Sequence, residues 1–206
     1  TAEDKFTVLR GWLDEAKAAP VPVMKSADIE TVEMDTVHSN MTKTEYLDAI
    51  AKIKHYIVEG DTYQINFSQR FEKLFDGRPI DVFGWQNQFN PSPFAAYLAW
   101  DDKAVVSASP ELFIKVDGDL IVTKPIKGTR PRNPLLSDAS AENSEHFHDL
   151  VSSEKDQAEL AMIVDLERND LARICMPGTR HVRCQREINA FPTVYHAVAT
   201  VQGELA

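Results

Sequence analysis

A basic segment at residues 124–132 is the first place where the sequence could carry out chemistry. It holds four lysines and arginines and no acidic residue, in a chain whose formal net charge is −10. Such a segment is typical of a site for an anionic ligand, although a solvated turn has the same composition. Lys127 is the better candidate nucleophile, because a lysine beside cations such as Arg130 loses its proton more readily. The proline and glycine residues predict a loop with Lys127 at its apex.

Two acidic residues, Asp156 and Glu159, form a second candidate site near the start of an expected helix. They are three positions apart and share one helix face, and paired carboxylates are typical protein ligands of Mg²⁺. The dipole of a helix N-terminus favours acidic residues without any metal, and this simpler interpretation is the more common case. His146 and His148 precede them, but no third histidine or cysteine lies nearby in the sequence to complete a metal site.

Glu111 and His196 are two further candidates, each in a predicted strand. Glu111 follows a Ser-Pro pair at the beginning of its strand, where a side chain can emerge at a sheet edge. His196 interrupts an otherwise apolar strand, and a lone strand histidine is more often structural than catalytic. Neither residue alone establishes a site.

The elements that must position these residues alternate between helical and strand patterns. A capping-box pattern at residues 42–45 predicts a helix that ends at Gly60. A second helix is expected over residues 153–174, after a polar loop at 135–152. An amphipathic N-terminal helix is expected on Phe6, Leu9 and Leu13. Strands are predicted at 63–70, 94–100, 103–107, 111–116, 120–126, 180–188 and 193–203.

Antiparallel runs of strands with intervening helices predict an α+β fold. Residues 1–40 are expected to be a connector from an N-terminal region, and residues 41–206 to form one domain. The 206 residues are 43% hydrophobic, which is enough for a core.

The net charge argues against nucleic acid as a partner, and no apolar run approaches the ~20 residues that span a membrane. Two cysteines are too few for a disulfide framework, so a reduced, cytoplasmic setting is expected.

Together these segments resemble the chorismate-binding enzyme family. This family includes the first components of anthranilate synthase and aminodeoxychorismate synthase, and the isochorismate and salicylate synthases. Five stretches match family motifs in the family's order, at residues 60–66, 90–94, 108–111, 125–132 and 158–173. The resemblance implies antiparallel sheets in a sandwich-like core flanked by helices.

The resemblance also implies roles for the candidate residues. Glu111 matches the general acid that protonates the hydroxyl leaving from C4 of chorismate. Glu159 matches one of the glutamates that bind Mg²⁺, and Asp156 matches a nearby acidic position of less defined role. Gly128 and Thr129 match residues that line the substrate site.

Three further matches concern the reaction within the family. His196 matches an active-site histidine of anthranilate synthase. Gln64 stands where isochorismate-type members carry a water-activating lysine, and glutamine cannot act as a base, so ammonia is the expected nucleophile. At the position of Lys127 the anthranilate and isochorismate synthases typically have alanine, whereas aminodeoxychorismate synthases have lysine. For that branch the resemblance implies that the lysine attacks C2 of chorismate, and that ammonia then adds at C4 and expels the lysine.

The resemblance therefore implies amination of chorismate to 4-amino-4-deoxychorismate, on the route to p-aminobenzoate and folate. The partners it implies are chorismate, ammonia and a glutaminase subunit or fused domain. Anthranilate synthase component I is the alternative enzyme, and a catalytically incomplete binding module is the alternative class. Later family motifs, including a second Mg²⁺ glutamate, have no counterpart here, so we expect the C-terminal part of the domain to be missing and the fragment alone to turn over weakly.

Overall fold

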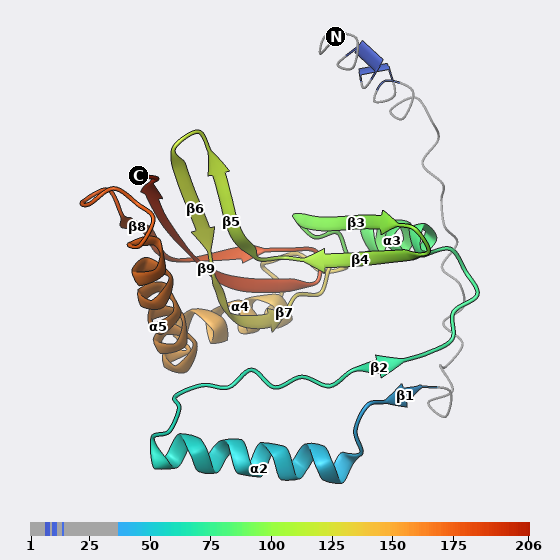
Figure 1. Cartoon of the computed structure of the whole chain (residues 1–206), viewed down its shortest axis with the longest axis horizontal. Coiled ribbons are helices and arrows are strands. Elements are labelled where there is room, and N and C mark those ends of the chain that lie inside the picture. Colours follow the sequence, from blue (N-terminus) through green and yellow to red (C-terminus); the bar gives the residue numbers. More distant parts are fainter. Residues whose placement is uncertain (1–6, 9, 12–13, 15–36) are drawn as a thin grey trace. The chain divides into compact units, whose positions relative to one another are not determined.

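The computed structural model describes residues 7–8, 10–11, 14 and 37–206, and it contains two compact units, Thr1–Gly77 and Arg78–Ala206. Figure 1 shows the order of their elements along the chain. The apolar positions Phe6, Leu9 and Leu13 lie outside the described residues. The division of the sequence at residue 40 stays a prediction. None of the described helices is long and apolar enough to cross a membrane.

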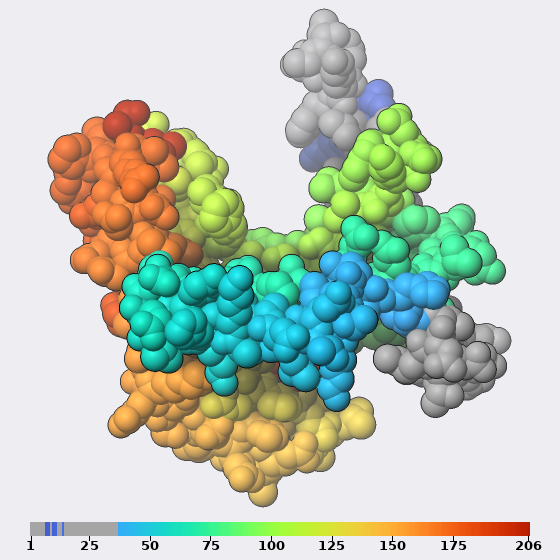
Figure 2. Space-filling view, turned by 60° about the horizontal axis from the view of Figure 1, so that its bottom comes forward, coloured from blue at the N-terminus to red at the C-terminus, as the bar shows by residue number. Residues whose placement is uncertain are grey.

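In the first unit, the predicted helix forms as α2, Lys43–Glu59. Its capping box is complete, because Thr42 Oγ1 accepts from the Glu45 amide at 3.2 Å and Glu45 Oε2 accepts from the Thr42 amide at 2.7 Å. Gly60 ends the helix with a φ of +81°. No residue of α2 is buried, and the helix shows as a continuous surface in the space-filling view (Figure 2).

The strand predicted at residues 63–70 does not form. The first unit has only two short strands in its described part, β1 (His38–Ser39) and β2 (Phe71–Glu72), which pair with each other. The alternating segment before β2 lies outside any strand, although the Phe67 ring packs on Tyr46 at a centroid distance of 5.5 Å. Alternation of polar and apolar residues creates a strand only where a neighbouring strand offers hydrogen bonds, and here the pairing with β1 begins at Phe71.

The second unit combines helices with antiparallel sheets, as the α+β prediction requires. The strands predicted after residue 90 form within two residues of their expected bounds, and α5 lies within three residues of the bounds of the predicted second helix. The elements are α3 (Pro79–Phe89), β3 (Phe94–Trp100), β4 (Lys103–Ser109), β5 (Leu112–Asp117), β6 (Leu120–Lys124), β7 (Ile126–Pro131), α4 (Ala141–Ser152), α5 (Glu154–Leu171), β8 (His181–Ala190) and β9 (Val194–Glu204).

Strand β9 is the centre of the five-stranded sheet. β6 and β7 pair with the two halves of one of its edges, and β8 pairs along the other. Helices α4 and α5 pack against this sheet (Figure 1). Alternate β9 residues enter the core beneath the helices. The buried core comprises Ile121, Leu150, Leu160, Val164, Leu171, Cys175, Tyr195, Ala197, Ala199 and Val201.

The basic segment is mostly a strand, which corrects the prediction of a loop with Lys127 at its apex. β7 pairs with β9, with Thr129 opposite His196. Pro125 separates β6 from β7, yet its carbonyl accepts a hydrogen bond from β9 at 3.0 Å, so both strands follow one edge. The register shifts just before Thr129, where Gly128 has a φ of +93°. Proline and glycine interrupt a ladder, but the long edge of β9 supplies partners on both sides of the interruption.

The stretch expected to be a polar loop, residues 135–152, contains helix α4. Ser140 caps it by accepting from the Asn143 amide at 3.3 Å. Leu150 is fully buried, and the Phe147 ring meets Tyr195 edge-on at 5.6 Å. Phe147 and Leu150 therefore help to dock this helix, together with the buried Asn143.

Asn143 explains how the connection before α4 is held. It is 0% exposed, and its Nδ2 donates to the carbonyls of Asn133, Leu136 and Ser137 at 3.1–3.3 Å. Its Oδ1 accepts from the Asn133 amide at 2.8 Å. One buried side chain thus contacts four backbone groups of this connection, of which the Asn133 and Ser137 carbonyls also accept from the amides of Leu136 and Ser140.

We expect Asn143→Ala to lower the free energy of unfolding by about 2–4 kcal/mol, because it leaves buried backbone groups unpaired. Urea unfolding followed by circular dichroism measures this change. Asn169→Ala, at an exposed position of α5, is the matched control and should change stability by less than about 0.5 kcal/mol. Equal effects of the two substitutions would contradict the anchoring role of Asn143.

Candidate functional site

Glu111 and Lys127 come together at the start of β7. Glu111 Oε1 accepts a hydrogen bond from the Ile126 amide at 2.7 Å, which fixes the carboxyl group beside the residue that precedes Lys127. Lys127 is half-buried, and its Nζ donates to the Ile126 carbonyl at 3.0 Å. The carboxyl group and the amine therefore bind the amide and the carbonyl of one residue, Ile126.

His196 and Thr129 form the next pair of the site. They face each other across β7 and β9, and Thr129 Oγ1 lies 2.8 Å from His196 Nδ1. Burial lowers the pKa of His196, while the negative charge of Glu111 and a hydrogen bond with the Gly128 backbone act against this shift. The burial effect is the largest, so the imidazole is held in its neutral form.

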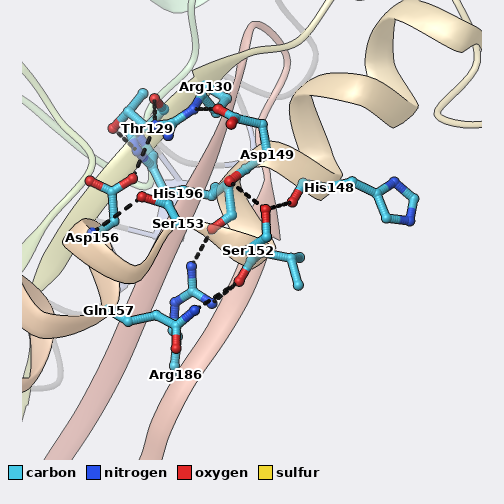
Figure 3. A network of polar contacts seen from close by, with 12 residues as sticks. Thr129, Arg130, His148, Asp149, Ser152, Ser153, Asp156, Gln157, Arg186 and His196 are labelled. Carbon is cyan, nitrogen blue, oxygen red and sulfur yellow. Dashed lines mark hydrogen bonds and ion pairs between the residues drawn. The ribbon is translucent and has the colours of Figure 1, made fainter.

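Arg130 ties β7 to the junction of α4 and α5 (Figure 3). Its Nε donates to Asp149, and its Nη1 lies 3.1 Å from Asp156 Oδ2 in an ion pair. The same Nη1 donates to the Thr129 carbonyl at 3.0 Å. The hydrogen bond with Asp149 is the main cause that raises the pKa of Arg130. The buried Asp156 therefore has a guanidinium partner inside the chain.

These contacts change the interpretation of the basic segment. Arg130 is paired with two carboxylates, and Arg132 donates to Asp138 at 2.7 Å. Their charges are compensated locally by these carboxylates. The expectation that cationic neighbours activate Lys127 stays a prediction.

Gly128 has a conformation and surroundings that exclude a side chain. A Cβ atom there would lie 2.8 Å from Leu150 Cδ1 and 3.0 Å from Asp156 Cβ. The backbone of β7 thus touches the ends of α4 and α5 directly, next to Lys127. The predicted substrate-lining residue Gly128 makes this close contact, and Thr129 follows it in β7.

The described residues fit a magnesium site only in part. Glu159 is partly exposed on α5, but Asp156 is paired with Arg130 and is a poor metal ligand for that reason. Within residues 37–206 no three histidine, cysteine, aspartate or glutamate side chains are grouped so that they could hold a metal. Glu159 is therefore the one predicted metal ligand that is not already paired in the described part of the chain.

Gln64 belongs to the other unit of the chain. It lies in the first unit, exposed in the segment before β2, whereas the other candidates lie in the second unit. Its role stays a prediction from the sequence.

Two features of the site were not predicted. Glu167 on α5 is half-buried, and Thr123 Oγ1 donates to its Oε2 at 2.9 Å. Its spacing from Val164 and Leu171, both core residues, was the available signal, since it places an acidic residue on the inward helix face. Asp138 is the second: it accepts from the Tyr195 hydroxyl at 2.6 Å as well as from Arg132. No sequence spacing indicates that contact.

The family model that describes a chorismate binding enzyme matches residues 1–206. The chain belongs to the chorismate-binding enzyme family. Aminodeoxychorismate synthase component 1 of Salmonella typhimurium is 41% identical over 81% of this chain and 36% of its own length. Anthranilate synthase component 1 3 of Haloarcula marismortui is 40% identical over 82% of this chain and 33% of its own length. The chain thus spans about a third of the length of these relatives.

A solved structure agrees with the fold. The crystal structure of anthranilate synthase component I from Streptococcus pneumoniae superposes with a TM-score of 0.72 at 26% identity. It covers 100% of this chain, and this chain covers 44% of it. The predicted class, antiparallel sheets combined with helices, is confirmed by this likeness and by the sheets of the second unit.

We expect Gly128→Ala to lower the free energy of unfolding by about 3 kcal/mol, from backbone strain and from the contact with α4 and α5. Gly118→Ala is the matched control: Gly118 also has a positive φ, +60°, but nothing lies within 4 Å of its Cβ position. Its cost should be about 1 kcal/mol. If urea unfolding shows the same decrease in the free energy of unfolding for both variants, the close contact at Gly128 does not contribute to stability.

The lowered pKa of His196 predicts a pH dependence of stability. In the unfolded chain this histidine binds a proton near pH 6.5, whereas in the folded chain it does so only at a lower pH. The contribution of the neutral His196 to the free energy of unfolding is therefore present above pH 6.5, and it is lost as the pH falls through the pKa of the folded state. We expect His196→Gln to differ from wild type in unfolding free energy more at pH 7.5 than at pH 5.5. Exposed His38→Gln should give the same difference at both pH values. A pH-independent effect of His196→Gln would refute this prediction.

Proposed function

We propose that this chain belongs to the chorismate-aminating subunit of an aminodeoxychorismate synthase. The reaction joins chorismate and ammonia to give 4-amino-4-deoxychorismate and water. The observation that carries the proposal is Lys127, a half-buried lysine whose amine binds the Ile126 carbonyl while Glu111 binds the Ile126 amide. A lysine in this motif distinguishes the aminating branch from members with alanine, and the relatives include an aminodeoxychorismate synthase component 1 at 41% identity.

The chemistry begins with the neutral amine of Lys127, which forms a bond to C2 of the substrate as the bond from C4 to its hydroxyl breaks. Glu111 donates the proton with which the hydroxyl leaves as water. Ammonia then forms a bond to C4, and the bond between C2 and Lys127 breaks. Two allylic displacements place the amino group where the hydroxyl was. The hydrogen bond from the Ile126 amide holds Glu111 in place for the first step.

His196 and Thr129 complete the proposed pocket from β9 and β7. A neutral imidazole can donate or accept a hydrogen bond at the substrate without adding charge, and Thr129 fixes its orientation through Nδ1. Gly128 carries no side chain, which lets this part of β7 lie directly against Leu150 and Asp156 beside the proposed pocket. Gln64 has no basic group with which to activate water, which favours ammonia over water as the second nucleophile.

We include Mg²⁺ in the proposal, with Glu159 as its ligand in the described part of the chain. A magnesium ion would neutralise a substrate carboxylate. The remaining ligands would come from groups other than Asp156, since that carboxylate is paired with Arg130. We further propose a cytoplasmic setting and a glutaminase, as a subunit or a fused domain, that supplies the ammonia.

Anthranilate synthase component I is the second candidate, because relatives with that name are as similar as the aminodeoxychorismate synthases. Lys127 is the residue that separates the two proposals. An anthranilate synthase releases pyruvate and fluorescent anthranilate, whereas the proposed reaction releases neither.

The test uses the natural full-length protein incubated with chorismate, Mg²⁺ and ammonium. We expect mass spectrometry to find a chorismate-derived adduct on Lys127, and chromatography to find 4-amino-4-deoxychorismate. Lys127→Arg keeps the positive charge but has no neutral amine near pH 7 to attack C2, so it should lose the adduct and lower the rate by at least about 100-fold.

Lys115→Ala is the control for general effects of lysine removal, since Lys115 is exposed on β5. It should leave the adduct and the rate unchanged. Direct appearance of anthranilate with pyruvate would overturn the proposal in favour of the second candidate. Absence of any turnover in the full-length protein would favour a binding module.

A further inference from the structure

Arg132 is a half-buried arginine to which the proposed reaction gives no role. It directly follows β7, and its amide donates to the Thr193 carbonyl at 2.8 Å, one step beyond the last pair of β7 and β9. Its side chain is 21% exposed and contacts residues 191–193, which connect β8 to β9 and are called the β8–β9 turn below. An arginine binds several acceptors in one plane through a rigid fork of N–H groups. The acceptors around Arg132 therefore show what it holds in place.

Two carbonyl groups of the β8–β9 turn accept hydrogen bonds from Arg132. Its Nη1 lies 3.2 Å from both the Phe191 oxygen and the Pro192 oxygen. The Phe191 amide donates to the Val194 carbonyl at 2.8 Å, so the turn is also closed by its own backbone. Backbone carbonyls that lie outside a strand ladder need donors from elsewhere. One guanidinium group supplies both of these carbonyls and so fixes the path of the turn.

A carboxylate and an aromatic ring hold the guanidinium group itself. Its Nε donates to Asp138 Oδ1 at 2.7 Å, and the Tyr195 hydroxyl donates to the same oxygen at 2.6 Å. The hydrogen bonds from Arg132 and then from Tyr195 lower the pKa of Asp138, so this anchor stays charged at neutral pH. The Cζ atom of Arg132 also lies 6.0 Å from the centroid of the Tyr195 ring. Because Tyr195 is buried in the core, these contacts connect the β8–β9 turn to the core.

The β8–β9 turn contacts the proposed site through the ring of Phe191. This ring meets the imidazole of His196 with centroids 5.3 Å apart and planes at 62°. His196 is 9% exposed, and its neighbours along the sheet are Thr129 of β7 and Asn189 of β8. Thr129 contacts Nδ1 of the imidazole, whereas Phe191 presents an apolar surface to it. The position of one aromatic ring therefore affects how much water reaches the imidazole.

The protonation of His196 depends mainly on its burial. The groups that face it from β7, β8 and the β8–β9 turn are Thr129, Asn189 and Phe191, which are uncharged. The negative charge of Glu111, just before β5, raises the pKa of His196, and a hydrogen bond with the Gly128 backbone acts in the same direction. Burial is the larger effect and lowers the pKa. Exclusion of water is therefore what keeps the imidazole neutral.

We propose that Arg132 is a positioning residue for His196: it holds the β8–β9 turn so that the Phe191 ring stays on the imidazole and keeps water away from it. This inference rests on the proposed function, in which a neutral His196 makes a hydrogen bond with the substrate. Arg132 itself makes no contact with the substrate in this proposal. The two arginines of the basic segment then have different tasks, since Arg130 joins β7 to α4 and α5.

A purely structural role for Arg132 makes a different prediction. If the guanidinium group only tied the β8–β9 turn to Asp138, its replacement would lower the free energy of unfolding without changing the protonation of His196 in the folded protein. The midpoint of the His196 titration in the folded state therefore separates the two interpretations. It is measured without substrate, by NMR of the natural full-length protein with carbon-13-labelled histidine, and His196→Gln identifies the signal.

Arg132→Lys is the first variant, because it keeps the positive charge but cannot bind two carbonyls and a carboxylate in one plane. We expect the His196 midpoint to rise by about half a pH unit, since a looser turn lets water reach the imidazole and weakens the effect of burial. Arg180→Lys, at an exposed position, is the matched control and should leave the midpoint unchanged. An unchanged midpoint in folded Arg132→Lys, or equal shifts in the two variants, would overturn the proposal.

A double-variant cycle tests whether the effect of Arg132 passes through Phe191. Phe191→Ala removes the ring and should raise the His196 midpoint at least as much as Arg132→Lys does. When Arg132→Lys is added to Phe191→Ala, the midpoint should change by less than about 0.2 units, because the ring that transmits the effect is gone. If the two shifts add, Arg132 acts on His196 by another route, and the proposed route is wrong.

A further measurement needs no substitution at Arg132, in case that variant fails to fold. In nitrogen-15 spectra of the wild-type arginine side chains, the Nε–H of Arg132 should exchange with water more slowly than that of the exposed Arg180, because it donates to Asp138 and the side chain is mostly covered. Phe191→Ala alone should still raise the His196 midpoint. Exchange as fast as at Arg180, or a midpoint that does not depend on Phe191, would refute the positioning role.

Turnover of the full-length protein separates this inference from the proposed function. With chorismate, Mg²⁺ and ammonium, Arg132→Lys should lower kcat by about 3–10-fold and change KM by less than about twofold, and it should have no further effect when added to His196→Gln. If the wild type forms no 4-amino-4-deoxychorismate, the proposed function fails, and the titrations still decide the role of Arg132. If the product forms but the His196 midpoint is unchanged in Arg132→Lys, only the role of Arg132 fails.

Discussion

The pairing of one strand with three others is the constraint on which the rest of the second unit depends. β9 holds β6 and β7 along one edge and β8 along the other. Because β6 and β7 share an edge, the chain must break its ladder between them, and it does so at Pro125 and Gly128. Glu111, Lys127 and Thr129 all gather at this break. The interruption between β6 and β7 therefore lies at the place where the candidate reactive side chains are found.

Compensation of charge divides the site into two parts. On the helix side of β7, Arg130 is surrounded by the carboxylates of Asp149 and Asp156, and the ion pairs fasten the strand to α4 and α5. At the start of β7, the carboxyl group of Glu111 and the amine of Lys127 contact the backbone of Ile126 instead. The ion pairs give rigidity, whereas the proposed chemistry uses the two groups held by the backbone. The chain separates these two uses of charge by only a few residues.

Local sequence signals predicted the elements whose causes are local. The capping box of α2, the Asp-Gly hairpin between β5 and β6 and the helix α5 needed no tertiary information. The strand expected at residues 63–70 and the loop expected at 135–152 were wrong, because pairing with a distant strand and docking on a sheet decide those segments. For the site, the types of Lys127, Glu111 and His196 indicated chemistry, but only the fold shows that the arginines are paired. Glu167 was missed because its partner Thr123 is distant in sequence.

The central position of β9 has a consequence for how the chain folds. β9 follows all of its partner strands in the sequence, and its pairing with β6 joins residues such as Leu120 and Glu204. During synthesis, which proceeds from the N-terminus at about 5–20 residues per second, β5 to β8 emerge before the strand that unites them. Contacts so far apart in sequence slow folding. The sheet therefore cannot assemble before β9 has emerged, and the start of β7 takes shape only when β9 is present.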